Sequence, residues 1–70
     1  MNYHVVYNRN MRLLALRLVP DMVAAFVTGG ELAAREYLEE ALEITANNAA
    51  EREALNDHMM AGYRIATSRH

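Results

Sequence analysis

The chain has 70 residues, no cysteine and a formal net charge of −2, and 53% of its residues are hydrophobic. This length allows one domain (1–70), the apolar content argues against intrinsic disorder, and the lack of cysteine excludes disulfides and thiolate metal sites. A domain of this size buries only about 60% of its unfolded surface, so we expect two copies to share one core as a homodimer.

The charges are divided along the chain. The first twenty residues carry three cations and no acid: Arg9, Arg12 and Arg17. The stretch 31–57 carries eight acids and two arginines, and the remainder carries Asp21, Arg64 and Arg69. A membrane span needs about 18 consecutive apolar residues. The apolar run Met11–Val19 is shorter and interrupted by arginines. We expect a soluble, cytoplasmic protein with no membrane partner.

The N-terminal stretch Asn2 to Asn8, NYHVVYN, is rich in tyrosine and valine, which favour strands. No later stretch resembles a second strand. We therefore predict an N-terminal arm over 1–9, extended or forming a short strand over 3–7. In the strand alternative, it pairs with its counterpart in the dimer.

The next stretch, from Met11 to Val19, favours a helix capped by Asn10 because most of its residues are good helix formers. Its alternating leucines leave a strand over 13–19 open. Pro20 is expected to end this element and to open a short second helix, PDMVAAFV. The pair Gly29-Gly30 is expected to form the following turn.

The central stretch has the clearest helical pattern, with a helix expected over about 29–47. Thr28 and Glu31 fit a capping box, and Glu31 with Arg35 makes a favourable i,i+4 pair. One face of this helix is acidic: Glu36, Glu39, Glu40 and Glu43. Like charges at i,i+4 cost about 0.2–0.5 kcal/mol each in an isolated helix. Either this face is solvated or a cationic surface lies beside it, and we hypothesise the basic N-terminal segment of the same chain or of a dimer mate.

The last helix is expected over about 49–66, because Asn48 and Glu51 form another cap-like pair. A tight turn at Asn47-Asn48 makes it an antiparallel αα-hairpin with the central helix, and one continuous helix over 31–66 is the alternative. Gly62 amid the apolar face suggests close helix contact. Residues 67–70 are expected to fray. The fold class is thus all-α, with three or four short helices built on this hairpin.

Groups for catalysis are nearly absent. The chain has no lysine, its one serine is Ser68 near the end, and no glutamate stands three residues before a histidine as in di-metal bundles. His58 lies on the apolar face of the last helix, where a core or interface role is expected. We predict a non-enzymatic protein with no cofactor and no metal.

Protein binding is the function that the pattern favours. Amphipathic helices exceeding the needs of one thin core suit recognition of another protein. The residues expected at the dimer or partner interface are Tyr37, Leu38, Leu42, Leu55, His58, Met59 and Tyr63. By size and class, such a chain is typical of phage- and plasmid-type regulators and inhibitors.

DNA binding is the alternative, with Arg9, Arg12 and Arg17 as phosphate contacts. The stretch LALRLVPDMVAAFVTGGELAAREYLEEAL resembles ribbon-helix-helix repressors, which are dimers that insert a paired strand into the major groove. The resemblance implies that Leu14, Leu16 and Leu18 point inward from a strand. The chain departs from that family because only nine residues separate Pro20 from Gly30, and because the second helix lacks a serine-rich start.

Overall fold

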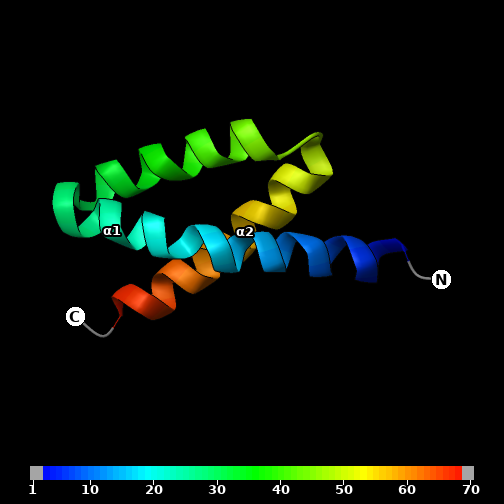
Figure 1. Ribbon diagram of the computed structural model, residues 1–70, viewed down its shortest axis with the longest axis horizontal. Coiled ribbons are helices and arrows are strands. Elements are labelled where there is room, and N and C mark those ends of the chain that lie inside the picture. Colours follow the sequence, from blue (N-terminus) through cyan, green and yellow to red (C-terminus); the bar gives the residue numbers. More distant parts are fainter. Residues whose placement is uncertain (1–2, 69–70) are drawn as a thin grey trace.

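The computed structural model describes residues 3–68, with side chains from Asn10 onward. It contains two helices, α1 (Tyr3–Thr45) and α2 (Ala49–Thr67), and no strand within residues 3–68. Figure 1 shows α2 running back across the first part of α1. The prediction of an all-helical, hairpin-like fold is confirmed.

Helix α1 is bent at Gly30, whose φ of 79° and ψ of −170° are not helical. The bend divides α1 into an N-terminal segment (3–29) and a central segment (31–45). Figure 1 shows the central segment turning back beside the N-terminal segment. The expected three or four separate helices are therefore two, of which the first is folded back on itself.

The prediction of an extended arm or strand at the N-terminus is wrong, because residues 3–7 belong to α1. The strand alternative over 13–19 is wrong for the same reason. Met11, Ala15 and Met22 are the buried residues of this segment, and their separations of four and seven match a helix rather than the two-residue period of a strand. A single strand would also leave its backbone groups unpaired, whereas a helix pairs them internally.

Pro20 was predicted to end the helix, but α1 continues through it. A proline inside a helix removes one backbone hydrogen bond and costs about 3 kcal/mol. Ala15 and Met22, on either side of Pro20, are both buried on the same face. Burial of these flanking residues offsets the cost, so tertiary packing overrides the local preference.

Any L-amino acid with a side chain should destabilise the bend at Gly30. A Gly30→Ala variant meets no atom within 4 Å, but its φ of +79° with extended ψ is a region that essentially only glycine occupies. We expect the free energy of unfolding, measured with urea, to fall by about 1–3 kcal/mol. D-alanine at position 30, introduced by chemical synthesis, adds the same methyl group and favours this conformation. It should be at least as stable as the natural chain; equal losses in both variants would contradict the backbone argument.

Thr28 does not cap the central segment. Its hydroxyl donates instead to the carbonyl oxygens of Ala24, at 3.0 Å, and Ala25, at 3.3 Å, in the preceding turn. Glu31 pairs with Arg35 at 3.2 Å, as the i,i+4 spacing predicted. The predicted capping box is therefore absent, because the bend lies at Gly30 and Thr28 still belongs to the N-terminal segment.

The predicted cap at Asn48 is confirmed. Its side-chain oxygen accepts a hydrogen bond from the Glu51 backbone N–H at 2.9 Å, and the Glu51 carboxylate accepts one from the Asn47 N–H at 3.0 Å. The break at 46–48 excludes a continuous helix over 31–66. Helix α2 extends to Thr67, one residue beyond the predicted end, and residues 69–70 of the expected frayed tail lie outside the described residues.

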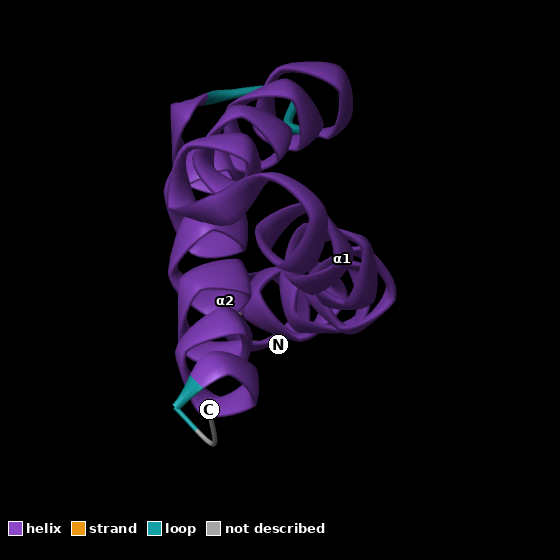
Figure 2. Cartoon of the chain, turned by 90° about the vertical axis from the view of Figure 1, so that its left-hand side faces the viewer, coloured by secondary structure: helices purple, strands orange, loops and turns teal. Residues whose placement is uncertain are grey.

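The core lies where α2 crosses the two segments of α1, a crossing that Figure 2 shows from the side. Met22, Leu55 and Met59 are fully buried there. Phe26 and Tyr63 meet edge to face with ring centroids 5.8 Å apart. The remaining buried members of the core are Met11, Ala15, Ala34, Leu38, Ala41 and Leu42.

Gly62 allows α2 to approach the N-terminal segment closely. A Cβ at this position would lie 3.0 Å from a methyl carbon of Val19. The prediction that this glycine marks a close helix contact is confirmed.

Candidate protein-interaction surface

Most residues predicted to form the dimer or partner interface pack inside the chain. Leu38, Leu42, Leu55, Met59 and Tyr63 are buried. The other two, Tyr37 and His58, are half-buried. The side chains of Tyr37 and His58 are therefore accessible to a partner in the folded chain. The other five are already buried in the contact between α1 and α2.

The exposed apolar side chains lie elsewhere. On the N-terminal segment, Leu13 is 51% exposed, Leu16 63% and Val27 70%. Together with exposed Pro20 and Ala24 they form what we call the apolar row: Leu13, Leu16, Pro20, Ala24 and Val27. Their separations place them on one face of the helix, opposite buried Met11, Ala15 and Met22. The N-terminal segment is thus apolar on both faces, which is typical of a helix with partners on both sides.

Sequence reasoning missed the apolar row because it ended the helix at Pro20. Two short elements on either side of a break share no common face. The three- and four-residue separations would have identified the row if the helix had been extended through the proline.

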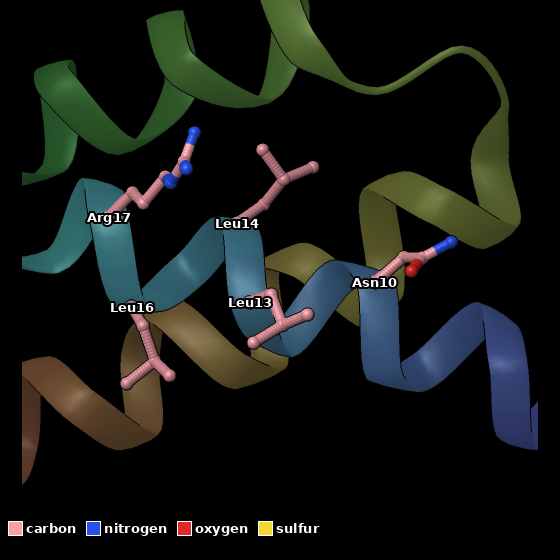
Figure 3. Close-up of a pocket in the computed structure, with 5 residues that line it drawn as sticks. All are labelled: Asn10, Leu13, Leu14, Leu16 and Arg17. Carbon is pink, nitrogen blue, oxygen red and sulfur yellow. The ribbon is translucent and has the colours of Figure 1, made fainter.

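Two hollows border the N-terminal segment, and only the second has lining residues from both this segment and the central segment. One open hollow of about 610 Å³ is lined by Asn10, Leu13, Leu14, Leu16 and Arg17. Figure 3 shows Leu14 and Arg17 pointing toward the central segment, whereas Leu13 and Leu16 point away from it. A second hollow of about 210 Å³, the inter-segment groove, is lined by Leu18, Tyr37, Glu40, Ala41, Ile44 and Thr45. Ile44 is 77% exposed, so the wall of this groove offers apolar surface to a partner.

Tyr37 joins the two segments beside this groove. Its hydroxyl donates a hydrogen bond to the Asp21 carboxylate at 3.5 Å. Partial burial raises the pKa of the Tyr37 hydroxyl above 10.0, and the negative charges of Asp21 and Glu40 raise it further. The tyrosine is therefore held in its neutral, donating form.

The raised pKa of Tyr37 predicts a loss of stability in alkali. Because the folded state holds this proton more tightly than the unfolded state, the stabilisation is complete below pH 10 and is lost as the pH rises through the raised pKa. Tyr37→Phe keeps the ring but removes the titrating hydroxyl. We expect its unfolding free energy, measured with urea between about pH 9 and 11, to fall less steeply than that of the natural chain. Asp21→Asn should reduce the slope in the same direction; identical slopes in all three chains would exclude Tyr37 as the cause.

The acidic face is exposed throughout, at Glu36, Glu39, Glu40 and Glu43. Glu39 pairs with Arg52 of α2 at 2.6 Å. Among the described residues, the ion pair that this face makes is therefore with α2, whereas we had hypothesised the basic N-terminal segment as its cationic neighbour. Glu40 lines the inter-segment groove instead, so the face divides between α2 and the groove.

The arginines proposed for DNA contact do not share one face. Arg12 and Arg17 are exposed and form no ion pair with another described residue. Five residues apart on a helix, they are separated by about 140° and flank the apolar row on opposite sides. The side chain of Arg9 lies outside the described part of the chain. The resemblance to ribbon-helix-helix repressors fails structurally, because Leu14, Leu16 and Leu18 belong to a helix.

One stretch of α1 within Asn10–Thr45 is long and apolar enough to cross a membrane by length and composition alone. The sequence prediction considered only uninterrupted apolar runs and did not identify it. Core helices of soluble proteins pass the same test, but only 11% of this window is buried. The bend at Gly30 limits the straight part to the N-terminal segment, where Arg17 and Asp21 would each cost about 2.5–3.5 kcal/mol at the centre of a bilayer. The absence of a membrane partner and the cytoplasmic location stay predictions.

Within the part of the chain that the structure describes, no group of three or more histidine, aspartate or glutamate side chains could hold a metal ion. No protein-family model, curated protein or solved structure matches this chain. The apolar row, the inter-segment groove and the acidic face are therefore the candidate functional surfaces.

Proposed function

We propose that this chain is a non-enzymatic protein-binding module that acts as a small homodimeric regulator or inhibitor of a larger protein. The observation that carries the proposal is the inter-segment groove, where exposed Ile44 stands beside half-buried Leu18 and Tyr37. An apolar helix of a target can pack into a groove between two helical segments with its side chains at three- and four-residue spacing.

The charges beside the groove define the partner further. Glu40 lines the groove, and Glu36 and Glu43 are exposed on the same segment without an ion pair among the described residues. An amphipathic target helix with lysine or arginine along its edge would complement these carboxylates. The proposed ligand is therefore a positively charged amphipathic helix.

Comparative capture from the natural host tests this proposal. The natural chain should retain a specific protein, and Ile44→Gln should lose it because the variant replaces a 77% exposed apolar side chain of the groove with a polar one. Ile65→Gln on α2 is the matched control, since Ile65 is 65% exposed but does not line the groove. Capture that is equal for both variants, or no specific capture at all, would refute the assignment.

Binding of DNA is the second candidate, favoured by the exposed arginines Arg12 and Arg17, which form no ion pair with another described residue. A salt titration of binding to random duplex DNA separates the candidates. Phosphate contacts produce an affinity that falls steeply with salt concentration. Lack of DNA binding at low salt would eliminate this candidate.

A further inference from the structure

The apolar row has a spacing that reads the same from either end. Its members are separated by three, four, four and three residues, so Pro20 stands in the middle. A second N-terminal segment can therefore run in the opposite direction with the two copies of Pro20 facing each other. Each residue of the row then lies opposite a residue of the second copy's row. This symmetry suits a twofold interface, in which the same surface patch of two identical chains meets itself.

Antiparallel alignment also places large side chains opposite smaller ones. Leu16 lies opposite the second copy's Ala24, and Leu13 lies opposite its Val27. Alternation of large and small side chains lets two helices interlock closely. The row spans about 21 Å, roughly two heptads, whereas a free-standing coiled coil has about three or four. We therefore expect a dissociation constant in the micromolar range.

Charges along one edge of the row favour the antiparallel direction. Arg17 and Asp21 are exposed on the edge of the row nearest the central segment (Arg17 in Figure 3), where Asp21 also accepts the Tyr37 hydrogen bond, and they do not pair with each other. In a twofold antiparallel pair the same edges of both copies meet. Arg17 and the second copy's Asp21 are then offset by only about 3 Å along the helix axis. In a parallel pair, the edge with Arg17 and Asp21 would meet the opposite edge of the second copy. That opposite edge carries Arg12 and no acid.

We infer that the apolar row is the surface on which a second copy of this chain packs, antiparallel about Pro20, with two reciprocal Arg17–Asp21 ion pairs. The inference rests on the homodimer in the proposed function and names its interface. The inter-segment groove on the neighbouring side stays free for the target.

Charge exchange tests the interface in the full chain. Sedimentation equilibrium from about 5 to 500 µM should show a dimer for the natural chain. Arg17→Asp and Asp21→Arg, made singly, should each weaken dimerisation about tenfold, since each replaces two symmetric ion pairs with repulsion. The double variant R17D/D21R should recover to within about threefold of the natural affinity.

Three controls separate this effect from loss of fold. Arg64→Asp changes an exposed arginine of α2 and should leave the dimer unchanged. Tyr37→Phe removes the hydrogen bond to Asp21 without a charge change and should also leave it unchanged. Circular dichroism should show native helix content in every variant.

Two results would overturn the inference: a natural chain that stays monomeric throughout the range, or single charge reversals that leave the dimer intact. Vesicles of phosphatidylcholine with phosphatidylglycerol test the competing occupant. A monomer that sediments with these vesicles, and loses this binding in Leu16→Gln, would assign the row to lipid instead. Target capture through Ile44 is measured independently. A monomer that still captures its target refutes the homodimer and its interface but not target binding, and a dimer without a target refutes target binding alone.

Discussion

A Leu38→Asp variant should not fold. Leu38 is 5% exposed within the core between α1 and α2, and no described side chain there is a buried cation. Loss of the apolar side chain and burial of an unpaired carboxylate together cost more than about 5 kcal/mol, which is comparable with the entire stability of a domain of this size. Circular dichroism should show loss of helix, and sedimentation should show loss of the dimer with it.

Leu32→Asp is the matched control for this substitution. Leu32 belongs to the same central segment but is 70% exposed. It also lies in the first turn after the bend, where an acid interacts favourably with the helix dipole. We expect a change within about 0.5 kcal/mol. A folded, soluble Leu38→Asp chain would show that the core is elsewhere.

Leu55→Ala should lower the free energy of unfolding by about 2–5 kcal/mol. Leu55 of α2 is fully buried, so the substitution removes its packing and leaves a cavity where α2 crosses α1. Urea unfolding should show a lower midpoint with an unchanged slope, because the surface exposed on unfolding is nearly the same.

Leu32→Ala removes the same atoms from an exposed position and should change stability by less than about 0.5 kcal/mol. Equal effects of the two leucine substitutions would mean that α2 does not dock as described. The pair thus measures the contact between α1 and α2 separately from helix propensity.

The predictions from sequence that the structure confirms depend on local chemistry. The cap at Asn48, the Glu31–Arg35 pair and the close contact at Gly62 each follow from a few neighbouring residues or from one missing side chain. Local hydrogen bonds and steric limits act the same way in many folds. Such features are therefore predictable without knowledge of the tertiary structure.

The errors concern positions where local preference does not decide the structure. Tyrosine and valine near the N-terminus favour a strand, and Pro20 favours a helix end, yet both lie in α1. Thr28 and Glu31 fit a capping box, but the bend lies at Gly30, so Thr28 bonds backward to Ala24. Strand and helix preferences differ by about 1 kcal/mol per residue or less, and burial of a side chain such as Met22 can exceed that.

The sequence by itself determined the helical class, the turn before α2 and the acidic face, because periodicity and caps are properties of short stretches. Only the tertiary structure decided which apolar residues are buried within the chain. Leu38, Leu42, Leu55, Met59 and Tyr63 pack within the chain, whereas the apolar row remains exposed. Both groups are apolar at helical spacing, so hydrophobicity cannot distinguish them. The distinction comes from the positive φ of Gly30, which folds α1 back on itself and determines which face α2 covers.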